Sequence, residues 1–102
     1  MSFEELAAEI DSWMPITVTA SETLTAARAE PAGLVLTASV GGADAVAFDA
    51  SAARLAHRSL ACDLLMTRMV LDAGIGVSYR LVGADGTTLD TLAFTAADCA
   101  QP

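Results

Sequence analysis

The spacing of the hydrophobic residues changes at Pro15, and this change restricts the chain to folds that combine helices with strands. Before the proline, hydrophobic residues recur every three or four positions, which is the spacing of one helix face. The residues on this face are Phe3, Leu6, Ile10, Trp13 and Met14. Ser2 and Glu5 have the spacing of a capping box, so we expect a helix over 2–14. Pro15 ends this helix, and residues 16–19 then alternate as in a strand.

Two later segments predict β-hairpins. Residues 22–30 and 34–40 are separated by Pro31-Ala32-Gly33, which supplies a fixed φ followed by a position free to take positive φ. Hydrophobic residues alternate with others over 34–40, as in a strand with one buried face. A similar alternation over 75–95, interrupted at Ala84-Asp85-Gly86, predicts the second hairpin.

A long helix is predicted between the hairpins. Asp49 or Ser51 can cap its start, and Gly74 can take the left-handed position that ends it after about residue 72. Before this helix, residues 41–44 indicate a break in regular structure. Residues 45–48 fit either a short strand or a loop.

This second helix is amphipathic but carries one misplaced acid. Its hydrophobic side comprises Leu55, Cys62, Met66, Met69 and Val70, and its polar side comprises Arg54, His57, Arg58, Arg68 and Asp72. A continuous helix would place Asp63 on the hydrophobic side, where an unpaired carboxylate is unfavourable. We therefore expect a break at Cys62, with Asp63 capping a new turn from Leu64.

Together these segments predict an α+β fold. Their order is helix, strand, strand, helix, strand, strand, and the simplest way to bury the hydrophobic faces is a two-layer structure. In it, an antiparallel four-stranded sheet carries both helices on one face. A chain of 102 residues has room for one domain, over 1–102. Because 22 residues are alanine and only five are aromatic, the core is thin.

The charge balance excludes some partners. Five arginines, no lysine and 13 acidic residues give a net charge of −8, which opposes binding to nucleic acid. No hydrophobic run approaches the length of a transmembrane helix, so we expect no membrane partner. The start of the chain lacks the basic segment of a signal peptide. We expect a cytoplasmic protein if Met1 is the native start, and a periplasmic or secreted one if a leader has been trimmed.

Several short motifs together resemble a pattern in small uncharacterised bacterial proteins. These are Trp13-Met14-Pro15, Thr23-Leu24, Leu34 to Val40, Cys62-Asp63, Leu71-Asp72-Ala73-Gly74, Tyr79, Gly86 and Asp98-Cys99. The resemblance implies an α+β domain with paired cysteines that is exported, and it implies no activity. The chain departs from this pattern because it lacks an export signal.

Cys62 and Cys99 are the only cysteines. An even count without metal-ligand spacing fits either a disulfide or two buried thiols, and a reactive redox or metal role is the weakest alternative. If the tail after the second hairpin returns beside the second helix, residues 96–99 are long enough to bring the two sulfur atoms together. The residues therefore favour the disulfide.

No motif indicates chemistry, a cofactor or a metal. His57 lies beside Arg54 and Arg58, whose charge opposes its protonation, so we expect a solvated histidine rather than a general base. No serine has the context of a catalytic nucleophile. The acids of the first helix form a solvated face; they are Glu4, Glu5, Glu9 and Asp11.

What remains for function is the surface. Three of the five arginines, Arg54, Arg58 and Arg68, lie on the second helix and are candidate contacts for a protein partner or a second copy, as in a homodimer. We therefore predict a non-enzymatic protein-binding or assembly module that uses this helix or a sheet edge. The first alternative is a small ligand-binding protein or enzyme with a pocket between helices and sheet, with Asp63, Tyr79 and His57 as the candidate residues. The second is an acidic inhibitor or immunity-type protein.

Overall fold

The first helix, α1, begins where the sequence predicts. The structure is a computed structural model that describes residues 2–42, 45 and 47–100. α1 spans Phe3–Ser12, and Ser2 Oγ accepts a hydrogen bond from the Glu5 backbone N–H at 3.1 Å. Ile10 on its hydrophobic side is fully buried. Trp13 was predicted on the same side, but it follows the last turn as the C-cap and is 49% exposed.

The strands form one mixed sheet, which corrects the antiparallel four-stranded sheet predicted above. In the described residues it has five strands, in the order β1 (Ile16–Thr19), β2 (Glu22–Glu30), β3 (Gly33–Val40), β4 (Val77–Val82) and β5 (Thr88–Phe94). Both predicted hairpins are present, as β2–β3 and β4–β5. The additional strand is β1, which pairs with β2. β3 and β4 run parallel because the chain crosses over the sheet through helices between them.

The long helix predicted between the hairpins is two helices, α3 (Ala50–Asp63) and α4 (Leu65–Asp72). Asp49 caps α3, since its Oδ1 accepts hydrogen bonds from two backbone N–H groups of the first turn. Gly74 has a φ of +83° and ends α4, as predicted. The predicted break over 41–44 and the choice between strand and loop over 45–48 involve residues 43, 44 and 46, which lie outside the described residues.

The junction of α3 and α4 differs from the prediction by its position and by its cap. The helix breaks at Leu64, which has an extended ψ of 130°, and not at Cys62. Asp63 is the last residue of α3 and does not cap α4. The Thr67 hydroxyl instead donates to the Ala61 carbonyl oxygen at 2.7 Å. This bond satisfies a carbonyl at the end of α3, where helical partners run out.

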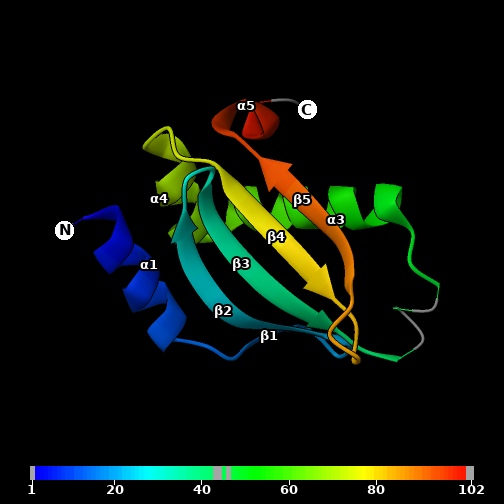
Figure 1. Ribbon diagram of the computed structural model, residues 1–102. Coiled ribbons are helices and arrows are strands. Elements are labelled where there is room, and N and C mark those ends of the chain that lie inside the picture. The colour runs from blue at the N-terminus through cyan, green and yellow to red at the C-terminus, as the bar shows by residue number, and fades with distance from the viewer. Residues whose placement is uncertain (1, 43–44, 46, 101–102) are drawn as a thin grey trace.

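One face of the sheet carries the core, and the α+β class is confirmed. Figure 1 shows α3 crossing behind the sheet, whereas the face turned to the viewer has no described helix over it. With α5 (Ala96–Cys99) the described residues form four helices, not the two predicted. The largest fully buried side chains are Tyr79, Phe94, Ile10, Leu24, Leu34, Leu36, Leu71, Leu81, Val70, Val77 and Thr67.

α1 covers the part of β2 that has no strand beside it. β1 pairs with β2 only over residues 22–24. Beyond this pairing, the Ala27 backbone N–H donates to Asp11 Oδ1 at 2.8 Å, and the same oxygen lies 3.3 Å from the Arg28 guanidinium. Asp11 was predicted to belong to a solvated face, but its carboxylate joins the helix to the sheet.

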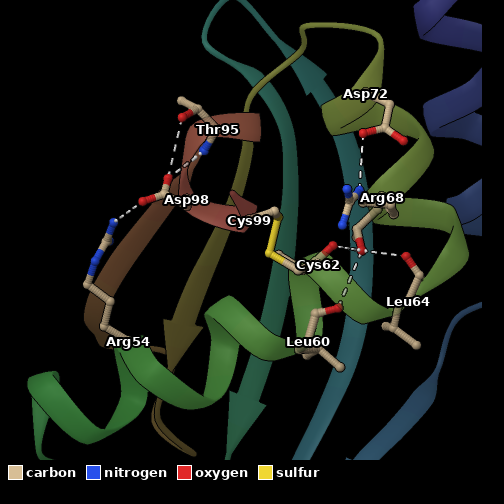
Figure 2. The surroundings of a disulfide bond; sticks show 11 residues. Arg54, Leu60, Cys62, Leu64, Arg68, Asp72, Thr95, Asp98 and Cys99 are labelled. Carbon is tan, nitrogen blue, oxygen red and sulfur yellow. Dashed lines mark hydrogen bonds and ion pairs between the residues drawn. A yellow bond between two sulfur atoms is a disulfide. The ribbon is translucent and has the colours of Figure 1, made fainter. Parts of the chain in front are cut away.

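The two cysteines form a disulfide between the end of α3 and α5, with the Cα atoms of Cys62 and Cys99 5.5 Å apart (Figure 2). α5 is a short helix that directly follows β5. Its start is a capping box in which the Thr95 backbone N–H donates to Asp98 Oδ2 at 2.8 Å. The second carboxylate oxygen of Asp98 lies 3.6 Å from the Arg54 guanidinium on α3. The disulfide and this ion pair therefore join the same two elements.

The turn between β2 and β3 passes close to the segment that enters β4. The Leu34 backbone N–H donates to the Gly76 carbonyl oxygen at 2.9 Å. Gly33 has a φ of +131°, and a Cβ atom there would lie 2.2 Å from that same oxygen. Only glycine fits at this crossing.

We therefore expect Gly33→Ala to lower the free energy of unfolding by at least about 2 to 3 kcal/mol, because the substitution adds both backbone strain and a clash with the main chain. Gly86→Ala is the control. Its φ is +83°, but no atom lies within 4 Å of the added Cβ. It should lose only about 1 to 2 kcal/mol. Urea unfolding measures the free energy of unfolding of both variants. Equal losses would contradict the close approach of residue 33 to the Gly76 carbonyl oxygen.

We expect Cys62→Ser/Cys99→Ser to lower the free energy of unfolding by about 3 to 4 kcal/mol, because the bond closes a loop with a sequence separation of 37. The measurement is urea unfolding of the oxidised protein and of the double variant. Reduced wild type is the control, and it should match the variant. If reductant also lowers the free energy of unfolding of the double variant, the loss in reduced wild type has a cause other than the disulfide.

Candidate functional site

A groove open to solvent lies between the second half of α3 and the edge strand β1. We call it the α3–β1 groove, and its volume is about 330 Å³. Its walls are mostly hydrophobic and come from β1, β2, α3 and the α3–α4 junction. The lining residues are Val18, Thr19, Glu22, Ala56, His57, Ser59, Leu60, Asp63 and Leu64.

A second hollow of about 300 Å³ adjoins this groove toward the start of α3. It is lined in part by Phe48 and Leu81. The two hollows share four lining residues, which are Thr19, Glu22, Ala56 and His57. His57 and Glu22 therefore lie where the hollows meet.

His57 and Glu22 form a buried pair that joins α3 to β2. His57 Nε2 lies 2.7 Å from Glu22 Oε2, and the two side chains are 7% and 12% exposed. His57 Nδ1 lies 2.7 Å from the Ala53 carbonyl oxygen one helical turn earlier. A carbonyl oxygen only accepts hydrogen bonds, so Nδ1 carries a proton. When Nε2 is protonated as well, the charged ring donates to the Glu22 carboxylate.

The pKa of His57 follows from the same contacts. Burial disfavours the charged ring and by itself lowers the pKa. The hydrogen bonds to Glu22 and to the Ala53 carbonyl, together with the negative charge of Glu22, outweigh it and raise the pKa above its ordinary value. Such a group stabilises the fold fully at low pH, and this stabilisation is lost as the pH rises through the raised pKa.

The burial of His57 corrects the expectation of a solvated histidine on an arginine face. Because the helix breaks at Leu64, residues of α4 cannot be assigned to a face of α3 by continuing its helical spacing. Within α3, the side toward the sheet contains Ala53, Leu60 and Ala61, three or four positions on either side of His57. Leu55, predicted to face the core, is 61% exposed.

Tyr79, a predicted pocket residue, lies beneath the pair and does not line the groove. Its side chain is fully buried, with its ring 5.1 Å from the His57 ring and 6.2 Å from the Phe94 ring. Burial raises the pKa of the Tyr79 hydroxyl, an effect that the nearby Thr67 hydroxyl partly offsets. No hydrogen bond of normal geometry reaches this hydroxyl from the described residues. Tyr79 is therefore a core residue.

Asp63, the third predicted pocket residue, lies at the rim of the groove. It is exposed and makes no ion pair within the described part of the chain. It follows disulfide-bonded Cys62 and precedes Leu64 in the chain, so the disulfide lies next to this end of the groove. Leu65 and Met69, one turn apart on α4, are 75% and 57% exposed, and Leu65 follows the groove residue Leu64 in the chain.

The three predicted partner arginines are divided between two helices. Arg54 on α3 is engaged, since its guanidinium lies 4.7 Å from the centre of the Phe94 ring and donates to the Ala93 carbonyl oxygen at 3.2 Å. Arg68 on α4 pairs with Asp72 at 3.1 Å. Arg58 has no ion pair among the residues that the structure describes. Their role as partner contacts stays a prediction.

The groove offers mostly hydrophobic contacts to a ligand. Glu22 and His57 are paired with each other, and the accessible surface around them is hydrophobic. Residues 2–42, 45 and 47–100 contain no group of three or more acidic, histidine or cysteine side chains that could hold a metal ion. Over the same residues, no helix is long and hydrophobic enough to cross a bilayer.

Sequence reasoning missed Glu22, whereas two of the three candidate residues of the alternative pocket, His57 and Asp63, line the groove. Glu22 is the first residue of β2, where an acid ordinarily faces solvent, and its partner lies 35 positions away. One local signal was present. The hydrophobic residues at 53, 60, 61 and 64 place position 57 at the centre of a helical face, so a histidine there needs a buried acceptor.

We expect Glu22→Gln to lower the pKa of His57, because burial then acts with less opposition. Loss of the charged partner should also lower the free energy of unfolding by about 1.5 to 3 kcal/mol below the pKa of His57. NMR titration of the ring measures the pKa without ambiguity, since His57 is the only histidine. Glu30→Gln, which removes a surface pair with Arg80, is the control and should leave the pKa of His57 unchanged. If the pKa of His57 does not fall in Glu22→Gln, Glu22 does not stabilise the charged form of the ring.

No protein-family model and no curated protein matches this sequence. Solved structures do match its fold. A Pseudomonas aeruginosa protein inferred to be secreted has a TM-score of 0.80 and 19% identity, with 95% of this chain and 88% of that chain covered.

Two further structures are pilotins of type II secretion systems. EpsS from Vibrio vulnificus has a TM-score of 0.78 and 19% identity, and covers 98% of this chain and 89% of its own. AspS from Vibrio cholerae has a TM-score of 0.78 and 16% identity, and covers 95% of this chain and 88% of its own. At these identities the likeness establishes the fold, which this chain shares with small bacterial proteins of secretion.

Proposed function

We propose that this protein is a non-enzymatic binding module that takes a segment of a partner protein into the α3–β1 groove. The observation that carries this proposal is the groove itself. It is open, mostly hydrophobic, and bounded by elements that a disulfide and a buried ion pair hold in place. A preformed hydrophobic groove loses little conformational freedom when it binds a partner.

The surroundings of the groove support a protein partner. Leu65 and Met69 lie exposed beyond one end, and an exposed hydrophobic surface next to a groove is typical of a protein-binding site. The buried ionisable groups are committed to each other, which leaves no free acid or base at the floor for catalysis. Two structural neighbours are pilotins of type II secretion systems, so the same fold occurs in proteins of secretion systems.

We further propose that the protein acts in the periplasm or outside the cell. A disulfide persists in oxidising compartments and is rare in the bacterial cytosol. Cys62 and Cys99 are both oxidised, and the structural neighbours include a protein inferred to be secreted. In such a compartment the Cys62–Cys99 disulfide, which lies next to the end of the groove at Asp63, stays intact.

The experiment is selection from a random 12-residue peptide library displayed on phage, with the immobilised oxidised protein as target. We expect enriched peptides that bind the groove. Ser59→Trp, an exposed position that lines the groove, should weaken them by at least about tenfold, because the indole fills the space. Ser51→Trp, exposed on the same helix but away from the groove, is the matched control and should bind normally.

Calorimetry with the synthetic peptides measures both affinities. Peptides that bind Ser59→Trp as well as wild type would contradict the proposal, and so would a selection that enriches no peptide.

A further inference from the structure

Side chains are hydrogen-bonded to backbone groups along both edges of the sheet. Beyond the short strand β1, Asp11 accepts the hydrogen bond of the Ala27 backbone N–H on the open side of β2. On the opposite edge, Asp90 Oδ1 accepts from the Thr91 backbone N–H at 2.8 Å, and Arg54 donates to the Ala93 carbonyl oxygen. An unpaired edge is a template for another strand, and charged side chains on the backbone prevent such pairing.

β1 lacks this protection. Its sequence is Ile16-Thr17-Val18-Thr19, which carries no charge and consists of β-branched residues that favour strands. No described side chain is hydrogen-bonded to the backbone of residues 16–18. β1 is thus the edge at which the described residues leave the backbone open, and it forms one wall of the α3–β1 groove.

We propose that the partner segment binds as an added strand on β1; this rests on the proposed function and specifies its binding mode. Successive side chains of a strand point to opposite faces of the sheet. Beside β1, one set of side chains of the added strand enters the groove, where Val18, Leu60 and Leu64 are hydrophobic. The other set lies next to exposed Thr17, on the open face. The partner segment therefore alternates hydrophobic with polar residues.

The negative charge of the groove rim and of the whole chain favours a partner segment with a basic residue. Asp63 stands unpaired at the groove rim within the described residues, no arginine lines the groove, and the whole chain has a net charge of −8. The added strand therefore carries a lysine or arginine that reaches Asp63. A second copy is a poor occupant, because β1 has no basic residue and two chains of this charge repel each other.

The probe is an acetylated and amidated ten-residue peptide that alternates valine with threonine and has lysine in place of one valine, so that the lysine lies on the side that enters the groove. Its control has identical side chains but carries N-methyl groups on every second backbone amide, on the edge that would face β1. NMR titration of the full oxidised chain measures the affinity. Hydrogen exchange of the Thr17 amide then reports whether the backbone is paired.

We expect the unmethylated peptide to bind, to slow exchange at Thr17 and to lose at least about tenfold in affinity on N-methylation, since each lost backbone hydrogen bond weakens the ladder. Asp63→Asn should lower the affinity of this peptide by about two- to fivefold and leave unchanged that of a peptide with valine in place of lysine. Asp85→Asn, an exposed acid in the β4–β5 turn, is the matched variant and should change neither.

Equal binding of the two peptides, binding without protection at Thr17, or no binding at all would overturn strand addition. These outcomes differ from failure of the proposed function. Phage-selected peptides that depend on Ser59 but bind as helices and leave Thr17 unprotected would keep the groove as a protein-binding site and reject the added strand. A selection that yields no groove-dependent peptide would reject both.

Discussion

The contact between α3 and the sheet determines the rest of this structure. α3 faces the sheet largely with alanines, which allow close approach but bury little hydrophobic area. The larger group at the centre of this contact is His57, which is polar and needs both of its hydrogen-bond partners. The bond to Glu22 therefore specifies where α3 lies. The groove exists because α3, positioned in this way, leaves β1 uncovered at the edge of the sheet.

The far end of the groove is fixed by different means. The chain leaves helical geometry at Leu64, and the Thr67 hydroxyl and the Cys62–Cys99 disulfide hold this junction from two sides. A helix junction without such ties would sample several angles, and each would give the groove another shape. A site held in one shape pays less entropy on binding. Alanine buries little hydrophobic area and so adds little stability to the core. The Thr67 hydrogen bond and the disulfide supply part of the stability that holds the groove in shape.

The sequence predicted what depends on neighbours in the chain. Both hairpins follow from turns such as Pro31-Ala32-Gly33, and the cap at Asp49 follows from its position. β1 was seen as extended but not placed in the sheet, because a strand of four residues carries too little pattern to indicate its partner. The parallel pairing of β3 with β4 depends on the path of the crossover helices. His57 was misplaced because residues on both sides of the break at Leu64 were treated as one helix.

An uncharged, β-branched edge would ordinarily pair with its own copies. The net charge of −8 opposes pairing between copies of the chain, and the four residues of β1 offer few backbone hydrogen bonds to a segment that brings no other contact. A segment of opposite charge gains the same backbone bonds and also fills the groove behind them. The charge that opposes self-pairing would therefore favour such a partner, so one property of the chain bears on both the protection of the edge and the choice of its partner.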